Sequence, residues 1–282
     1  MLHSLQQMQQ SRNTSAPPLA GAGPLARPLS ARSVIASMLL GMHPPRMRGA
    51  LLVKWCELFG IAEGTTRVAL HRMRAADELE LSDGSYTLAG PLVARQEHQE
   101  WSLEPRLRRW SGEWRLAVVG GERRTAPVRQ ALRTAMRRLR YAERREGLWL
   151  RPDNLPDDAA PAAARAIATA QCSWWTGAPD GDDPAVLAAS LFGISAWMRR
   201  AGALTDQLVV ETSSLRAEGF SALADSFVVG AAALQQVRAD PLLPDELLPD
   251  DWLGRALRLA YADYRAAFGV AAAAWFRSVR DS

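Results

Sequence analysis

The sequence has little of what several common protein classes require. Only two cysteines occur in 282 residues, and Cys56 and Cys172 lie too far apart along the chain to form a Cys-x-x-Cys metal or redox pair. The four histidines show no spacing typical of metal ligands. These scarcities exclude a disulfide framework and a zinc motif of standard spacing, and they favour a reduced, cytoplasmic setting.

Long apolar segments are also missing. The longest runs, Phe227–Leu234 around Gly230 and Gly269–Phe276, are shorter than the roughly 20 residues that cross a bilayer. The first ten residues are rich in glutamine and contain no hydrophobic signal core. We therefore expect neither a membrane span nor a secretion signal.

Lysine is almost absent, because Lys54 is the only one among 34 cationic residues. The two signs of charge are segregated along the chain. Residues 1–151 hold 24 Lys plus Arg against 13 Asp plus Glu, a balance of +11, whereas residues 152–282 hold 10 against 17, a balance of −7. A basic front half indicates a polyanionic partner, with nucleic acid first and a phosphate-rich small molecule second.

The N-terminal region has the pattern of a winged helix-turn-helix over residues 29–96. Before it, residues 1–28 are rich in Ala, Pro and Gly without periodicity, and we expect a flexible tail. A hairpin is predicted around Asp83-Gly84, where short runs of alternating polarity meet. Apolar residues at helical spacing predict three helices before it: Ser30 to Gly41, Gly49 to Gly60, and Glu63 to Ala76. This order places the third helix in the major groove of DNA.

The third helix has two distinct sides. Its apolar side is predicted to face inward and carries Thr66, Ala69, Leu70 and Met73. On the other side are the residues that we predict to face DNA: Thr65, Arg67, His71, Arg72 and Arg74. Arginine can bond two guanine acceptors or pair with phosphate, and threonine can contact a thymine methyl group. The alternative is an ordinary solvated helix face.

Three more cations lie around the start of the second predicted helix. Arg46, Arg48 and Lys54 are candidates for contacts to DNA phosphates, with simple solvation as the alternative. Asp83 lies at the tip of the predicted hairpin, and we do not expect the tip to hold phosphate.

Two further domains follow, so we expect an α+β chain. After a charged linker over residues 97–110, a ferredoxin-like α/β domain is predicted over residues 111–178, with strands at 114–119, 148–150 and 172–175 and helices at 126–139 and 159–170. Residues 184–282 have an almost wholly helical pattern. It is interrupted between Asp240 and Trp252, where three prolines predict an extended crossing.

Three stretches of this sequence carry a family resemblance: Arg67-Val68-Ala69-Leu70-His71-Arg72-Met73 in the third helix, Trp110–Leu116 with Gly147–Pro152 around the middle domain, and Asp240-Pro241-Leu242-Leu243-Pro244 through Leu247-Leu248-Pro249 to Trp252-Leu253-Gly254. Together with the order of the domains, they resemble the PaaX family of bacterial transcriptional repressors of phenylacetate degradation. The resemblance implies a homodimeric repressor of an aromatic-acid catabolic operon. It also implies binding to an inverted-repeat DNA operator and release by an aryl-coenzyme A thioester.

The middle domain is the most basic part of the chain. On its first helix Arg129, Arg133, Arg137 and Arg140 follow one another at helical spacing and predict a continuous cationic face. This face is a candidate for contacts to DNA phosphates, for binding the coenzyme A phosphates of an effector, or for pairing with the acidic C-terminal domain. Trp174 and Trp175 are candidates for an apolar slot for the aryl group, with packing in a domain core as the favoured alternative.

No catalytic site is predicted. Ferredoxin-like nucleases associated with CRISPR systems hold a metal with an acidic residue at the end of the first strand, but here no carboxylate follows that strand before Glu122. Nucleophile-elbow, phosphate-loop and dinucleotide motifs are also missing, so we expect no enzyme, metal or resident cofactor. The alternative function from a different class is a nucleic-acid-binding or architectural protein that uses the basic middle domain without sequence preference.

Overall fold

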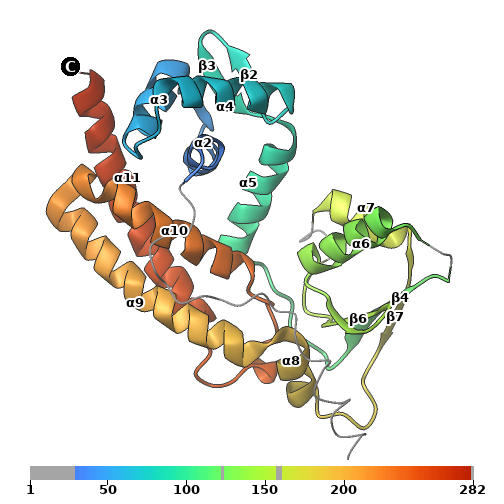
Figure 1. Cartoon of the computed structure of the whole chain (residues 1–282). Helices are drawn as coiled ribbons and strands as arrows, with labels where there is room; N and C mark the ends of the chain where they lie inside the picture. The colour runs from blue at the N-terminus through green and yellow to red at the C-terminus, as the bar shows by residue number, and fades with distance from the viewer. Residues whose placement is uncertain (1–28, 122–123, 157–160, 281–282) are drawn as a thin grey trace, which may run out of the picture.

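The computed structural model describes residues 29–121, 124–156 and 161–280, so the tail expected at residues 1–28 lies outside it. Figure 1 shows a small N-terminal helical region with a hairpin, a sheet domain with two helices, and a group of long C-terminal helices. The expected α+β class and the expected order of winged-helix, ferredoxin-like and helical regions are confirmed.

The N-terminal region has the three helices and the hairpin that the sequence predicts. Ser30 caps the first helix, since its Oγ accepts a hydrogen bond from the backbone N of Ser33 at 3.2 Å. A third strand, β1, adds to the hairpin, so the sheet order is β1-β3-β2. The elements are α2 (Ala31–Leu40), β1 (Arg46–Arg48), α3 (Gly49–Glu57), α4 (Glu63–Ala75), β2 (Leu79–Ser82) and β3 (Ser85–Leu88).

The connection to the middle domain differs from the expected linker at residues 97–110. Helix α5 (Gly90–Leu103) runs through its first seven residues, and only the chain from Glu104 onward is extended. Gln96 and Gln99 are buried polar residues on this helix, and Gln96 donates to the carbonyls of Leu40 and Met42 at 3.2 Å each. The sequence pattern did not predict this part of the helix, because its buried side carries polar residues and shows no apolar periodicity.

The middle domain is a four-stranded antiparallel sheet in the order β5-β6-β4-β7 with two helices on one face. This is the ferredoxin-like arrangement, and it contains one strand, β5, that the sequence pattern did not predict. Its elements are β4 (Trp114–Val119), α6 (Ala126–Arg138), β5 (Ala142–Arg145), β6 (Leu148–Pro152), α7 (Ala162–Thr169) and β7 (Cys172–Gly177).

Both faces of this sheet are covered, at least in part. Ala117 and Trp149 pack beneath α6 and α7. Side chains of the opposite parity, Trp114 and Leu150, pack against α8 (Pro184–Phe192) and the proline-rich crossing. The sheet domain is thereby attached to the C-terminal helices through its second face.

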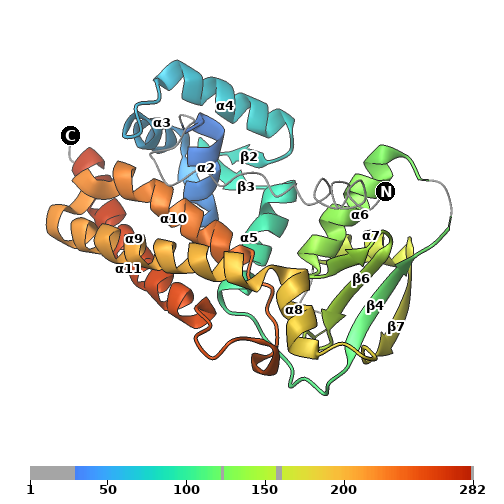
Figure 2. The same ribbon diagram turned by 60° about the horizontal axis from the view of Figure 1, so that its bottom comes forward.

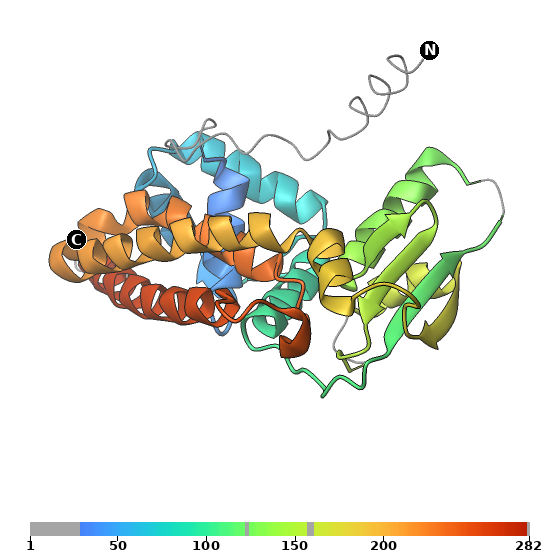
Figure 3. The same cartoon turned by 90° about the horizontal axis from the view of Figure 1, so that it is seen from below.

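The C-terminal region consists of long helices that lie side by side, as Figures 2 and 3 show. After α8 come α9 (Ile194–Glu218), the 3₁₀ turn η2 (Gly219–Ala222), α10 (Leu223–Arg238), η3 (Asp245–Leu247) and α11 (Gly254–Arg280). The crossing between α10 and α11 is held by stacking of Trp197 on Trp252, with ring centroids 4.2 Å apart.

The winged helix and the C-terminal helices share one hydrophobic core. Trp55 of α3 is fully buried and packs against Trp275 and Phe276 of α11, with centroids 5.3 and 5.6 Å away. Phe59 packs against Phe227 of α10 at 4.9 Å. The helix that supports α4 is therefore packed directly against the C-terminal region.

Among the described residues, the stretch Ile194–Arg238 contains an apolar window that could cross a membrane by length and composition alone. It contains two helices, α9 and α10, which pack against each other on either side of η2. Trp197, Leu204 and Leu208 on α9 are buried in the shared core. Core packing therefore accounts for part of its apolar composition, because 33% of the most apolar window is buried.

Candidate nucleic-acid interface and ligand cavity

Helix α4 separates its buried and exposed residues as its sequence predicts. Thr66, Leu70 and Met73 are at most 3% exposed, and Ala69 packs partly buried against the same core. The five residues predicted to face DNA are all exposed on this helix: Thr65, Arg67, His71, Arg72 and Arg74. Arg67 forms an ion pair with Glu63 one turn earlier, with Nη2 to Oε1 2.6 Å apart. The other cations of this face are available to a polyanion.

The wing, which consists of strands β1, β2 and β3, is held in a fixed position beside helices α3 and α4. Asp83 and Gly84 have φ angles of 51° and 69°, the left-handed pair that a two-residue type I′ turn requires. The backbone N of Gly49, at the start of α3, donates to the carbonyl of Gly84 at 3.0 Å. This bond ties the wing tip to the first residue of α3.

The candidate phosphate-binding residues lie on two elements. Arg46 and Arg48 are exposed on strand β1 of the wing, where Arg46 approaches Asp83 at 3.8 Å and donates to the carbonyl of Ser82 at 3.3 Å. Lys54 lies on α3 and pairs with Glu57 at 2.8 Å. Arg46 and Arg48 therefore belong to the wing and only border the second helix.

The cationic face predicted on α6 is only partly correct. Arg129, Arg133 and Arg137 are exposed on the helix, and Arg133 lies 3.6 Å from Glu143 of the same domain. Within the described part of the chain, no ion pair joins these three arginines to a carboxylate of residues 152–282. The proposed pairing with the acidic C-terminal domain is therefore not observed on this helix.

Arg140 is not part of that face, which is a second correction. It follows the end of α6 with a φ of 63°, and this left-handed backbone turns its side chain into the protein, where it is 7% exposed. Its guanidinium donates to the carbonyl of Arg238 and to Ser102 Oγ, and lies 5.6 Å from the ring centroid of Trp101. Burial lowers the pKa of Arg140 to about 10. This residue joins the middle domain to α5 and α10.

Trp174 and Trp175 do not form one slot. They are consecutive on the edge strand β7, so they point to opposite faces of the sheet. Trp174 packs edge-on against Tyr141 at 5.6 Å, whereas Trp175 is 65% exposed. The favoured alternative, burial of both in a domain core, is also wrong.

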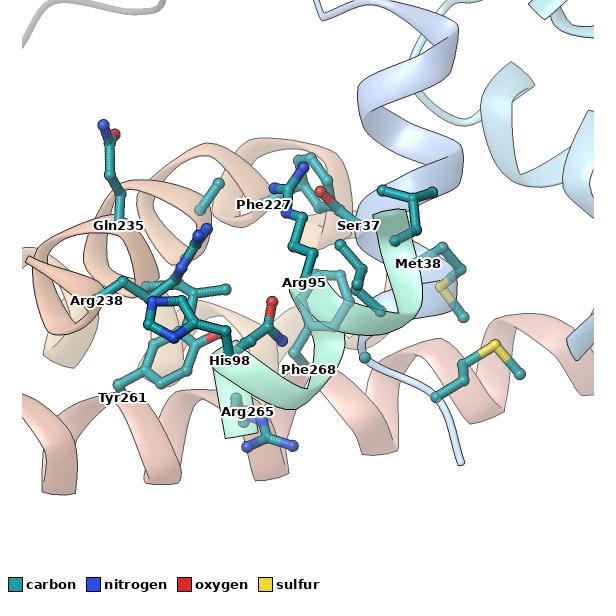
Figure 4. Close-up of a pocket in the computed structure, with 18 of the residues that line it drawn as sticks. Ser37, Met38, Arg95, His98, Phe227, Gln235, Arg238, Tyr261, Arg265 and Phe268 are labelled. Atoms are coloured by element: carbon teal, nitrogen blue, oxygen red, sulfur yellow. The ribbon is translucent and has the colours of Figure 1, made fainter. Parts of the chain in front are cut away.

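A large cavity lies where the three regions meet. Its volume is about 1100 Å³, and its walls come from α2, α5, α10 and α11, with Arg138 of α6 at one side. Figure 4 shows Arg95 and His98 on α5 near Arg238 of α10, with the rings of Phe227, Tyr261 and Phe268 beside them. The cavity thus has both a cationic and an aromatic lining.

The cationic part of this lining is poorly compensated. Arg95 Nε, Arg238 Nε and His98 Nδ1 are buried and have no hydrogen-bond partner among the described residues. Burial lowers the pKa of Arg95, and burial followed by the charges of Arg95 and Arg138 lowers the pKa of Arg238. Burial, helped by Arg140, Arg238 and Arg138, lowers the pKa of His98 to about 4, so His98 is neutral at pH 7.

Sequence reasoning missed this cavity. The spacing of Arg95 and His98, three residues apart on one helical face, is a usable signal, but the expected domain boundary at residue 96 divided it. No group of three or more His, Cys, Asp or Glu residues that could hold a metal occurs in the described ranges. Glu122, the first carboxylate after β4, lies outside those ranges.

Comparison with known proteins gives a consistent result. Family models match residues 30–91 (PaaX-like protein), 107–185 (PaaX protein central Cas2-like domain) and 199–278 (PaaX-like protein C-terminal domain). No curated protein matches.

Among solved structures, an uncharacterized protein from Mycobacterium tuberculosis is similar. It has 38% sequence identity and a TM-score of 0.66, and the match covers 87% of this chain and 98% of the other. The three family models together cover most of the chain, and the similar structure is 38% identical over 87% of it. This chain therefore belongs to the PaaX family of transcriptional regulators.

Proposed function

We propose that this protein is a cytoplasmic, homodimeric repressor that binds duplex DNA through α4 and is released by an aryl- or acyl-coenzyme A thioester. The observation that carries the DNA-binding part is the arrangement of α4. Its inner side is fixed in the core by Thr66, Leu70 and Met73, while its outer side presents arginines beside a rigid wing. A recognition helix needs this combination of fixed position and exposed cations.

Dimerisation would set the distance between two α4 helices and match it to two operator half-sites. Exposed apolar side chains on the C-terminal helices support an interface there, because Val209 and Val210 on α9 and Val270 on α11 are all more than half exposed. An effector that binds one dimer geometry more tightly than the other would then change the affinity for DNA.

A gel-shift titration tests this proposal. Purified protein is titrated at one salt concentration onto the DNA upstream of its own gene and onto a scrambled duplex, with and without a panel of aryl- and acyl-coenzyme A thioesters. We expect specific binding that exceeds scrambled binding by at least about 1000-fold and that one thioester abolishes. Equal, strongly salt-dependent binding to both duplexes would instead favour a nonspecific nucleic-acid-binding protein that uses the exposed arginines of α6.

A further inference from the structure

We propose that the cavity between α2, α5, α10 and α11 is the effector site. In this site Arg95, Arg238 and Arg138 receive the negative charges of the ligand, and the aromatic lining receives its apolar group. This inference rests on the proposed function only in assigning a role to the ligand. The site itself follows from the chemistry of the cavity.

The cavity has the size of a ligand site. Ligand sites usually occupy about 300 to 1000 Å³, whereas voids in protein cores rarely exceed the size of a water molecule. At about 1100 Å³ the cavity holds an organic ligand larger than a simple aromatic acid. It is lined by elements of both the winged helix and the C-terminal region.

The charge of the cavity defines one end of the ligand. Buried cations are normally paired, because removing a charge from water costs several kcal/mol. Here the nearby carboxylate is already engaged, since Glu78 accepts from Arg32 Nε at 2.9 Å. Within the described ranges, Arg95 Nε and Arg238 Nε are buried without a hydrogen-bond partner. A ligand with several negative oxygens, such as a phosphorylated carrier, would satisfy them.

The aromatic lining defines the other end. Phe227 is 8% exposed and Tyr264 is 5% exposed, and the Tyr264 hydroxyl already donates to the carbonyl of Ser226 at 3.0 Å. Tyr264 therefore offers the cavity its ring, with Phe268 and Phe276 on the same helix. An aryl or alkyl group fits this surface, and the two ends together describe a ligand with an anionic end and an apolar end, as the acyl-coenzyme A thioester of the proposed function has.

The position of the cavity gives such a ligand control over α4. Its walls include α2 and α5 of the winged helix on one side and α10 and α11 on the other. Trp55, which packs α3 onto α11, also lines it. A bound ligand would contact the winged helix on one side and the C-terminal helices on the other. A ligand that prefers a different spacing between these two regions would therefore also move the recognition helix α4.

Calorimetry in the absence of DNA tests the site, with phenylacetyl-coenzyme A, coenzyme A and phenylacetate as probes. We expect Arg95→Gln/Arg238→Gln to weaken thioester binding by at least about tenfold, because each substitution removes charge-assisted hydrogen bonds. The matched control, Arg129→Gln/Arg137→Gln, changes two exposed arginines outside the cavity and should bind as the wild type does. Gly269→Leu adds a side chain at an exposed position of the cavity lining, where a Cβ would meet no atom within 4 Å, and it should weaken thioester binding by reducing the space for the ligand.

The outcomes are distinct. Tight binding of phenylacetate alone would identify the free acid as the ligand and retain the site, whereas binding of coenzyme A alone at the strength of the thioester would overturn the assignment of the aromatic end. The proposal is wrong if the wild type binds none of the probes, or if the α6 control loses binding and the cavity variant does not. Normal thioester binding by a protein that ignores operator DNA would overturn the proposed function and leave the site intact.

Discussion

At the scale of single residues, two buried arginines join the middle domain to its neighbours. Arg140 reaches Ser102 on α5 and the carbonyl of Arg238 at the end of α10. Arg151, 3% exposed, donates to Asn154 Oδ1 at 2.8 Å, and Asn154 in turn donates to the carbonyl of Leu242 in the proline-rich crossing at 3.0 Å. Arg140 thus bonds directly to distant segments, whereas Arg151 holds Asn154, which makes the contact to the crossing.

Arg140→Met should destabilise the protein, because the carbonyl of Arg238 and Ser102 Oγ lose their buried donor. We expect a loss of about 1 to 3 kcal/mol in the free energy of unfolding, measured by urea denaturation. Arg137→Met is the control three residues earlier on an exposed position, and its effect should stay within about 0.5 kcal/mol. Equal effects of the two substitutions would show that the hydrogen bonds of Arg140 to the Arg238 carbonyl and to Ser102 do not stabilise the protein.

His98 should make stability depend on pH. Its pKa is about 4 in the folded chain against an ordinary value of 6.5, so the unfolded chain binds more protons between these two values. Stability contributed by neutral His98 is complete above about pH 6.5 and is lost as the pH falls toward 4. Because the ring is partly exposed, we expect about 1 to 2 kcal/mol over this range.

Unfolding free energies of the wild type and of His98→Gln at several pH values measure this contribution. The difference between the two proteins should be larger at pH 7 than at pH 4. A difference that is independent of pH would show that His98 does not titrate abnormally.

At the scale of elements, two glycines in the cavity-lining helices should respond in opposite directions. Gly269 lies inside α11 and a Cβ there would meet no atom within 4 Å, so Gly269→Ala should stabilise by about 0.5 to 1 kcal/mol. Gly230 lies inside α10, where a Cβ would clash with the ring of the buried Tyr264. Gly230→Ala should therefore destabilise by about 1 to 3 kcal/mol.

Thermal unfolding of these two variants is the measurement, with the wild type as reference. Two shifts of the same sign would mean that the packing of α10 against α11 differs from the one described.

The elements also show which patterns a sequence reveals. The three helices and the hairpin of the winged helix could be predicted, because apolar periodicity and Asp83-Gly84 are local signals. Strand β5 could not, because Ala142–Arg145 is an edge strand with three charged residues and a bulge between Glu143 and Arg145. Its structure is decided by pairing with β6.

The candidate sites divide in the same way. The exposed face of α4 follows from helical spacing alone and agrees with the observed burial. Helical spacing predicts Arg140 on the α6 face, because spacing does not reveal that the helix ends at Arg138 and that Arg140 has a positive φ. The cavity depends on tertiary packing, because Arg95 and Arg238 are brought together from distant parts of the chain.

At the scale of the whole molecule, the winged helix and the C-terminal helices share one hydrophobic core, so we expect them to unfold together. Trp55→Ala should cost about 3 to 5 kcal/mol of stability, since it removes a fully buried ring between α3 and α11. Hydrogen exchange should then become faster in both α4 and α11. Faster exchange in α4 alone would mean that the two regions are independent.

The most direct test of the central claim, that α4 reads DNA sequence, is the ratio of specific to scrambled DNA affinity at one salt concentration for Arg72→Ala and Arg137→Ala. We predict that Arg72→Ala lowers this ratio by about 5- to 150-fold, as expected for loss of a base contact, and that Arg137→Ala leaves it unchanged. An unchanged ratio for Arg72→Ala together with a loss of all binding for Arg137→Ala would contradict the account and assign DNA binding to the middle domain.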